Sequence, residues 1–176
     1  QHMATNAVLK DCVACLKAQD FDLVIVETAG IGQSDSEIVD LVDFPVYVMT
    51  SDFGAPSQLE KIDMLDYAEL VVLNKFDRRG AEDALRDVRK QYQRNREKFG
   101  ERVEDMPVFG TQASRFNDDG VTALYQAVAA HLQSKGLQLQ PGKLPKVETR
   151  QSSQSRAIVP AGRTRYLAEI ADSVRA

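Results

Sequence analysis

The sequence has little of several features that would point to other classes of protein. It contains two cysteines, two histidines and no tryptophan. No run approaches the roughly 18 apolar residues of a membrane-spanning helix, and no secretory leader is visible. Lysine and arginine total 22 against 26 aspartates and glutamates, so the formal net charge is −4. We therefore expect no nucleic-acid or membrane partner and a reducing, cytoplasmic setting.

The scarcity of metal-ligating residues also limits the role of the two cysteines. Cys12 and Cys15 have the spacing of a redox or metal-binding pair, but the sequence holds no second pair at zinc spacing. The only histidines are His2 and His131. Residues 5–19 have the apolar periodicity of a helix, and cysteine on such a face packs as a small hydrophobic residue. The sequence therefore favours packing over redox chemistry for both cysteines.

Short aliphatic runs alternate with amphipathic segments along most of the chain. The expected strands are residues 23–26, 46–49, 70–73 and 106–110, and the expected helices are residues 5–19, 34–42, 56–67, 80–99 and 121–135. This alternation is typical of βαβ units with a buried, mostly parallel sheet. The predicted fold class is therefore α/β with a doubly wound, mostly parallel sheet.

The fourth of these helices, residues 80–99, is strongly charged. Its sparse apolar positions are Leu85, Val88, Tyr92 and Phe99. Such a pattern indicates an exposed helix with many ion pairs along its surface.

The first expected strand ends on an acid and opens into a glycine-rich loop. Glu27 follows the apolar run directly, and Gly30 stands three residues later. In open parallel sheets, ligands bind at the loops that follow the strands. A carboxylate at Glu27 can hold Mg²⁺ beside a triphosphate, and the N–H of Gly30 can meet a γ-phosphate because no side chain blocks it.

Two further loops follow strand ends, and the first of them carries a stronger signal. In Asn74-Lys75-Phe76-Asp77, the Asp77 carboxylate can accept hydrogen bonds from the N1–H and 2-amino groups of guanine. Adenine lacks these donors, and such a mismatch discriminates by a factor on the order of 10⁴. The stem of Lys75 can lie along the base and Asn74 can join neighbouring loops, although an ordinary turn built from Asn and Asp is the alternative. Backbone N–H groups at Ala113 and Ser114 can meet the guanine 6-oxo group, although small residues suit any strand-to-helix loop equally.

The order and spacing of these loops resemble the later guanine-nucleotide motifs of P-loop GTPases. The string Glu-Thr-Ala-Gly-Ile-Gly-Gln-Ser at residues 27–34, with Asn-Lys-Phe-Asp at residues 74–77, resembles the MeaB group, the GTPase chaperones of cobalamin-dependent acyl-CoA mutases. The resemblance covers residues 1–138 and is strongest to members fused to a mutase that interconverts isobutyryl-CoA and n-butyryl-CoA. Residues 139–176 resemble the linker into that mutase, and the amphipathic segment 163–176 predicts a helix that docks onto something outside this sequence.

The resemblance implies roles for particular residues and ligands. Glu27 takes the magnesium-associated position, with Gly30 and Gln33 beside it in the catalytic and switch region. Gln58 and Lys61 fall in an extra switch loop that responds to nucleotide and contacts the mutase. The implied ligands are GTP or GDP and Mg²⁺. Adenosylcobalamin belongs to the cobalamin-binding and mutase domains of the same parent protein, a homodimer, and is not bound by these residues.

One departure from the family pattern decides what the chain can do alone. The Gly-x-x-x-x-Gly-Lys-Ser/Thr loop that grips nucleotide phosphates is absent from the sequence. In the family that loop precedes the segment matching residue 1. We therefore expect an internal piece of a larger protein, with an incomplete P-loop GTPase sheet and no unaided GTP hydrolysis.

Several other functions remain open on the sequence alone. They are a stand-alone or methylmalonyl-CoA mutase-associated GTPase chaperone, a metal-insertion GTPase, a receiver-like signalling module, and a pure docking module. The receiver reading leaves the Asn-Lys-Phe-Asp motif unexplained, and a metal-insertion GTPase needs more metal ligands than the chain offers.

Overall fold

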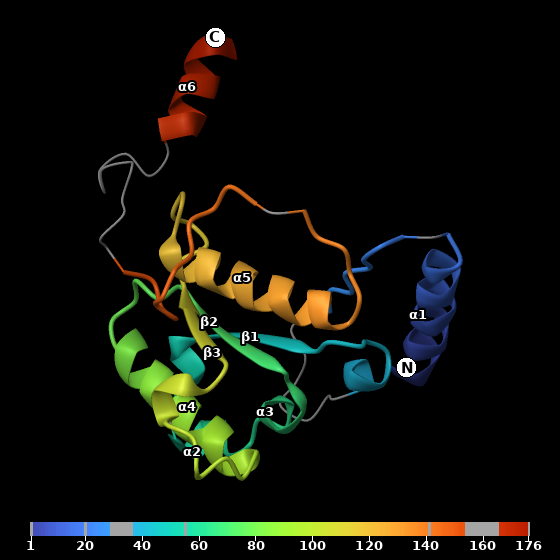
Figure 1. Cartoon of the computed structure of the whole chain (residues 1–176), viewed down its shortest axis with the longest axis horizontal. Coiled ribbons are helices and arrows are strands. Elements are labelled where there is room, and N and C mark those ends of the chain that lie inside the picture. Colours follow the sequence, from blue (N-terminus) through green and yellow to red (C-terminus); the bar gives the residue numbers. More distant parts are fainter. Residues whose placement is uncertain are drawn as a thin grey trace.

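A parallel sheet forms the centre of the protein in its computed structural model (Figure 1). The structure describes residues 2–19, 21–28, 37–54, 56–140, 142–153 and 166–175. The strands, in spatial order, are β1 (Val46–Thr50), β2 (Leu70–Asn74) and β3 (Val108–Thr111). Their register places Thr50 opposite Asn74 and Asn74 opposite Thr111. The carboxyl ends of all three strands therefore meet at one edge of the sheet.

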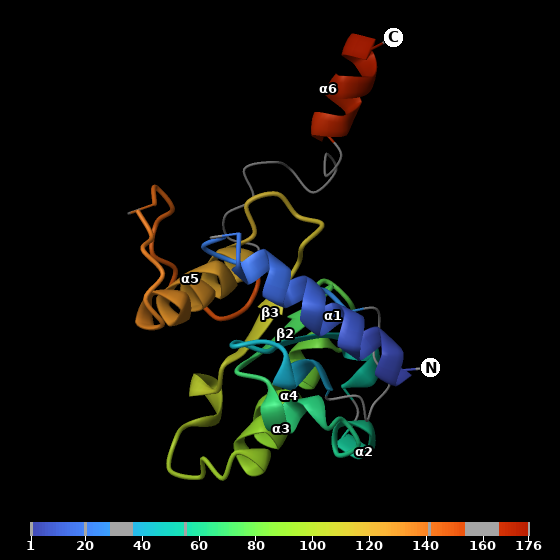
Figure 2. The same ribbon diagram turned by 90° about the vertical axis from the view of Figure 1, so that its right-hand side faces the viewer.

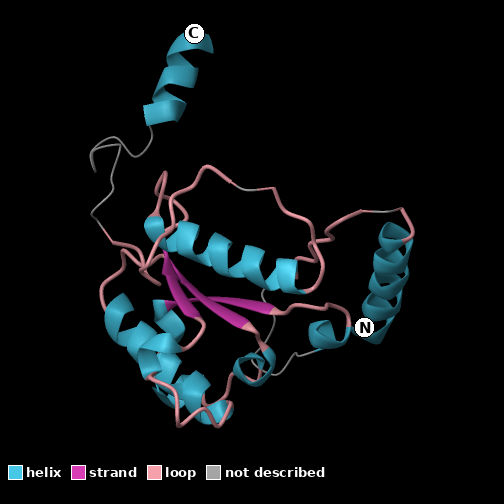
Figure 3. Ribbon diagram, viewed as in Figure 1, coloured by secondary structure: helices cyan, strands magenta, loops and turns pink. Residues whose placement is uncertain are grey.

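Helices cover both faces of this sheet, as Figures 1 and 3 show. One face carries α5 (Asp119–Ser134), and the other carries α2 (Pro56–Leu59), α3 (Met64–Tyr67) and α4 (Ala81–Asn95). The predicted α/β class with a parallel sheet between helices is confirmed.

The central strand supplies the core on both faces. Val71 and Leu73 belong to the larger apolar cluster, which includes residues of α2, α3 and α4, whereas Leu70 belongs to a second cluster beneath α5. All four residues from position 70 to 73 are buried, which explains why β2 is a continuous aliphatic run rather than an alternating one. Central placement therefore follows directly from the composition of the strand.

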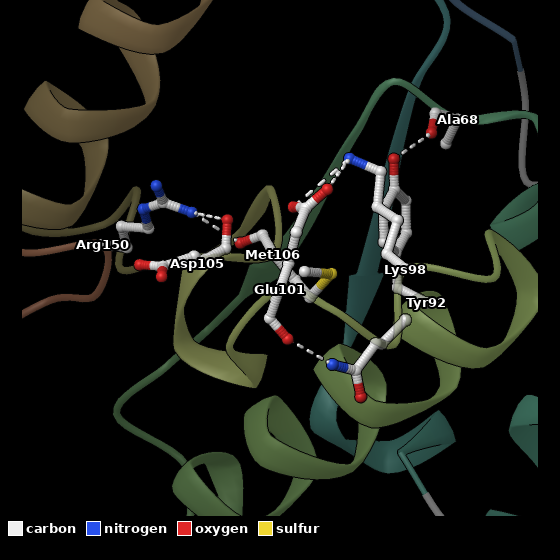
Figure 4. A network of polar contacts seen from close by, with 8 residues as sticks. Ala68, Tyr92, Lys98, Glu101, Asp105, Met106 and Arg150 are labelled. Atoms are coloured by element: carbon white, nitrogen blue, oxygen red, sulfur yellow. Dashed lines mark hydrogen bonds and ion pairs between the residues drawn. The ribbon is translucent and has the colours of Figure 1, made fainter.

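Helix α4 packs through one apolar stripe. Its buried residues recur at helical spacing: Ala81, Ala84, Leu85, Val88 and Tyr92. The Tyr92 hydroxyl donates to the carbonyl of Ala68 at 3.2 Å (Figure 4). Burial raises the pKa of that hydroxyl, against the opposing effect of Arg96. The charged face expected of this helix is present, and the apolar stripe fixes it to the sheet.

The strand expected at residues 23–26 does not form. Residues 23–28 are neither helix nor strand, and the Ile25 side chain is 83% exposed. On the sheet itself β1 is an edge strand, and its Val48 is 60% exposed. A buried strand needs a neighbour for its backbone groups. Within the described residues, residues 23–26 do not join the open outer edge of β1, so they have no partner strand.

The N-terminal helix forms but packs less than expected. In α1 (His2–Lys17), Val13 is buried, whereas Cys12 and Cys15 are exposed and unpaired. The prediction that these cysteines pack was therefore wrong. Figure 1 shows the reason, because α1 stands apart from the sheet and covers neither of its faces.

Two other expected helices are shorter than the sequence pattern suggested. The segment 56–67 divides into α2 and α3 around a turn at residues 60–63. In the described part of the segment 34–42, residues 37–42, the 3₁₀ turn η1 (Glu37–Asp40) stands in place of a longer helix. Apolar spacing alone did not reveal either interruption.

The C-terminal part has two distinct portions. Helix α6 (Tyr166–Arg175) forms where a helix was expected and stands apart from the other elements in Figures 1 and 2. Residues 147–153 instead run back to the sheet: Val147 packs under α5, and Gln151 makes an isolated parallel bridge to Gly110 of β3. No helix among the described residues combines the length and apolar character needed to cross a membrane.

A pair of alanine substitutions tests the packing of α4. Leu85→Ala should lower the free energy of unfolding of the chain by about 2–5 kcal/mol, because it leaves a cavity in the core. Phe99→Ala is the control, since Phe99 is 70% exposed and its truncation should cost less than about 0.5 kcal/mol. Urea unfolding followed by circular dichroism measures both. Equal losses at the two positions would contradict this packing.

Candidate functional site

The loops after β2 and β3 are joined by the side chain of Asn74. Its Oδ1 accepts hydrogen bonds from the Thr111 hydroxyl at 3.3 Å and from the Ala113 N–H at 3.2 Å. Asn74 is the last residue of the central strand and lies in register with Thr111. The tie between neighbouring loops that the sequence predicted for Asn74 is therefore present.

The chain turns sharply directly after Asn74. Lys75 has φ of 56°, in the left-handed region that a residue with a side chain seldom adopts. The next N–H, of Phe76, donates to the carbonyl of Thr111 at 3.0 Å. The Phe76 ring packs over Gly110, where an added Cβ would lie only 2.6 Å from it. This anchor holds the loop down while Lys75 and Asp77 remain exposed at the surface.

The loop after β1 is tied to the same corner. The Asp52 carboxylate pairs with the Arg78 guanidinium and accepts from the Thr50 hydroxyl at 3.1 Å. Asp52 lies in the 3₁₀ turn η2 (Ser51–Phe53). Sequence reasoning recognised this segment only as a loop, because no local spacing signals a partner 26 residues away.

The loop after β3 is held from its far end by a buried acid. Asp118 is 2% exposed, and its Oδ2 accepts from the Gln112 N–H at 3.2 Å. The same oxygen accepts from the Val121 N–H at 2.9 Å, so Asp118 also caps α5. Sequence reasoning did not assign Asp118 a role, although an acid three residues before Val121 is the usual signature of a helix cap.

The remaining predicted site residues are dispersed. Ser114 is exposed beside Ala113 in the loop after β3. Gln58 lies in α2 and Lys61 in the turn after it, where the Lys61 N–H donates to the Gln58 carbonyl at 3.1 Å, and both side chains are exposed. Glu27 is exposed in the segment that forms no strand. The structure does not bring Glu27 onto the edge of the sheet.

Two predicted residues, Gly30 and Gln33, lie outside the described residues. The contact of Gly30 with a γ-phosphate and the place of Gln33 in the catalytic and switch region therefore remain predictions.

The acidic residues could hold a magnesium ion only together with water and phosphate oxygens, not as a cage of protein ligands. Within the described ranges, no group of three or more His, Cys, Asp or Glu side chains stands close enough to cage a metal. Mg²⁺ in nucleotide sites keeps several waters and takes one or two carboxylates together with phosphate oxygens. The exposed carboxylate of Glu27 fits that use, whereas Asp52 is already engaged by Arg78.

These features define a class of protein. A parallel sheet between helices carries an Asn-Lys-x-Asp loop and a small-residue loop on its carboxyl edge, joined by Asn74. This is the arrangement of an α/β nucleotide-binding domain of the P-loop GTPase type. The sequence matches the family described as methylmalonyl-CoA mutase-associated GTPase MeaB over residues 4–162. The chain belongs to this family of GTPases.

Longer relatives share most of this chain. The fused isobutyryl-CoA mutase of Cupriavidus metallidurans is 63% identical over 97% of the chain and 16% of its own length. Proteins of the same name from Nocardia farcinica and Geobacillus kaustophilus are 60% and 48% identical, over 93% and 97% of the chain. The chain therefore spans about a sixth of the length of these curated relatives.

Removing the Asn74 side chain tests the tie at the centre of this corner. Asn74→Ala leaves the Ala113 N–H and the Thr111 hydroxyl without their acceptor, which should cost about 1–3 kcal/mol. Amide hydrogen exchange at Ala113 should become faster by roughly tenfold or more, because local opening becomes easier. Asn95→Ala is the control, because it also removes an accepting amide oxygen, the one bound by Gln91 at 2.8 Å at the end of α4. Unchanged exchange at Ala113 would contradict the tie.

Proposed function

We propose that this chain is the guanine-recognising part of a GTP-binding and GTP-hydrolysing chaperone domain. The observation that carries the proposal is the Asn74 tie, because it joins the end of β2, from which the loop with Asp77 starts, to the loop with residues 113–114. The exposed Asp77 carboxylate accepts the N1–H and 2-amino groups of guanine. The stem of Lys75 lies along the base.

The loop after β3 completes the recognition of the base. The N–H of Ala113 is already given to Asn74, so in our proposal the neighbouring N–H of Ser114 meets the guanine 6-oxo group. Adenine presents a donor at that position. Opposed donors and an unpaired Asp77 together exclude ATP.

The phosphates are handled by a different part of the site. We assign Glu27 to Mg²⁺, Gly30 to the γ-phosphate, and Gln33 to the switch region that meets the attacking water. When bound, Mg²⁺ would neutralise charge on the β- and γ-phosphates. The exposed edge of β1 and the unpaired residues 23–26 support the insertion of a further strand that carries the missing phosphate-gripping loop. Without that loop we expect no GTP hydrolysis.

In the parent protein, we propose that the GTPase gates the loading and protection of adenosylcobalamin for a radical mutase. The name shared by the relatives supports isobutyryl-CoA and n-butyryl-CoA as the interconverted pair. Residues 1–138 would form the GTPase part, and residues 139–176 the linker with its docking helix. Gln58 and Lys61 would report the nucleotide state to the mutase. We further propose a cytoplasmic homodimer.

Substitution of Asp77 in the full-length parent protein tests guanine recognition. Asp77→Ala removes two hydrogen bonds to a charged acceptor, so the affinity for GTP should fall by roughly 10²–10⁴-fold with little change for ATP. Asp77→Asn should allow binding of xanthosine triphosphate, because the Asn amide can donate to its 2-oxo group, which stands where guanine has a donor. Isothermal titration calorimetry measures all three nucleotides.

Asp66→Ala is the matched control for this series, since it removes an exposed carboxylate from α3, away from the edge where the three strands end. The assignment of Asp77 is wrong if GTP affinity survives Asp77→Ala, or if Asp66→Ala causes the same loss.

Turnover assays on the full-length protein test the mutase assignment separately. With adenosylcobalamin, GTP and Mg²⁺ present, isobutyryl-CoA should be converted to n-butyryl-CoA, and methylmalonyl-CoA should react at least roughly tenfold more slowly, as the pocket of the mutase portion must fit a neutral branched acyl group rather than a carboxylate. Gas chromatography of the hydrolysed acyl groups measures the products. Preference for methylmalonyl-CoA would overturn the substrate while leaving the GTPase assignment intact.

A further inference from the structure

Residues 149–153, which we call the strap, lie against the outer edge of β3. The Gly110 N–H donates to the Arg150 carbonyl at 3.0 Å, and the Ser152 N–H donates to the Gly110 carbonyl at 2.8 Å. In Figure 1 the strap passes the end of β3 beside the first turn of α5. The strap therefore closes the edge of the sheet at the strand that leads into the guanine loop, residues 111–115.

Two buried carboxylates fasten the strap. Asp118 and Asp119 are 2% and 6% exposed. Asp118 Oδ1 accepts from the Ser152 hydroxyl. Asp119 accepts from the Ser153 N–H at 2.7 Å and from the Ser153 hydroxyl. Buried carboxylates are tolerated only when their oxygens are hydrogen-bonded, so these serines are part of what keeps the acids in place.

Asp118 binds the strap and the guanine loop with the same carboxylate. One oxygen holds the Gln112 N–H and the other holds the Ser152 hydroxyl. Arg115, at the end of the guanine loop, makes a second link, because its guanidinium donates to the Ser153 carbonyl at 2.7 Å. The C-terminal end of the strap therefore holds both ends of the guanine loop, Gln112 through Asp118 and Arg115 directly.

The strap is also anchored on its other side. The Arg150 guanidinium donates to the carbonyls of Asp105 and Met106, the latter at 2.9 Å, as Figure 4 shows. At Gly120, an added Cβ would collide with the Gly110 carbonyl and the Ser152 N–H. The first turn of α5, β3 and the strap thus meet where no side chain intervenes.

We propose that the strap is a coupling element that sets the affinity of the site for guanine nucleotides, with Asp118 as its positioning residue. The inference rests on the proposed function. Releasing the strap removes the acceptor of Arg115 and one hydrogen-bond donor of Asp118, so residues 111–115 become less ordered. Binding of the base must then order these residues again, which lowers the affinity. Because the strap acts on the base and not on the phosphates, it changes the affinities for GTP and GDP together. By linkage, bound nucleotide holds the strap in place to the same extent.

The consequence for the parent protein is a route from the linker to the nucleotide. The strap precedes α6 in the chain, so any movement of α6 that pulls on residues 149–153 loosens the guanine loop. Such a pull would speed the release of GDP and GTP alike.

A double substitution in the full-length protein tests the coupling. Ser152→Ala with Ser153→Ala should weaken GDP and GTP by a similar factor, on the order of 3–30-fold. Ser152→Thr with Ser153→Thr keeps both hydroxyls and should restore most of the affinity. Ser134→Ala is the matched control, because the Ser134 hydroxyl donates to the His131 carbonyl of its own helix, at 2.6 Å, and it should change neither affinity.

A second measurement needs no substitution. In the wild-type protein, saturation with GDP should slow amide hydrogen exchange at Ser152 and Gly110, whose N–H groups join the strap to β3. If the strap were purely structural, the double alanine variant would have a lower thermal midpoint but unchanged nucleotide affinities. GDP would then not slow amide exchange at Ser152 in the wild-type protein.

The outcomes separate the two proposals. If the wild-type protein binds neither GDP nor GTP, the proposed function fails. If it binds both, and the double alanine variant retains wild-type affinities with no protection at Ser152, the coupling is overturned while the function stands. If the double alanine variant lost affinity for GTP but not for GDP, the coupling would also be overturned, because that result places the effect at the γ-phosphate rather than at the base.

Discussion

The two hydrogen bonds that the Asn74 carboxamide oxygen accepts are the interaction on which the carboxyl edge of the sheet depends. This oxygen sits at the last residue of the central strand, in register with the last residue of β3. From there it reaches both the Thr111 hydroxyl and the Ala113 N–H. The register of the sheet places the two loops side by side, and the Asn74 side chain joins them by hydrogen bonds. The left-handed turn at Lys75 and the Phe76 anchor then aim the following residues outward.

Carboxylates at this corner have two opposite physical conditions. Asp118 and Asp119 are buried, and each accepts several hydrogen bonds from the protein itself. Asp77 is exposed on the loop that Asn74 positions. An acid whose oxygens are already bonded serves the fold, whereas an exposed acid on a fixed loop is available to a ligand. Burial, more than residue type, separates the two uses.

The parts of the fold that could be predicted from sequence are those with a local cause. The aliphatic run of β2 is buried on both faces, and the stripe of Leu85, Val88 and Tyr92 repeats at helical spacing. The role of Asn74 followed from its position at a strand end. The run at residues 23–26 has the same local character as β2, yet forms no strand, because pairing depends on a neighbour and not on composition.

Contacts between distant residues were the other limit of prediction. Nothing within a few residues of Asp52 indicates Arg78, and nothing near Asp118 indicates Ser152, 34 positions later. The polar composition of residues 148–156 is typical of a linker, although part of that stretch is held by backbone and carboxylate bonds. Polar residues that satisfy buried acids look, in sequence, like polar residues that face water.

The open edge of β1 has a consequence for handling the protein. Val46 and Val48 border a row of backbone groups that, among the described residues, the sheet leaves without a partner strand on that side. Such an edge is a template for any extended apolar segment, including the same edge of a second molecule. A solution of this chain alone would therefore lose monomers to edge-to-edge association as its concentration rises, and charged or proline substitutions facing outward from β1 are the natural means of keeping it dispersed.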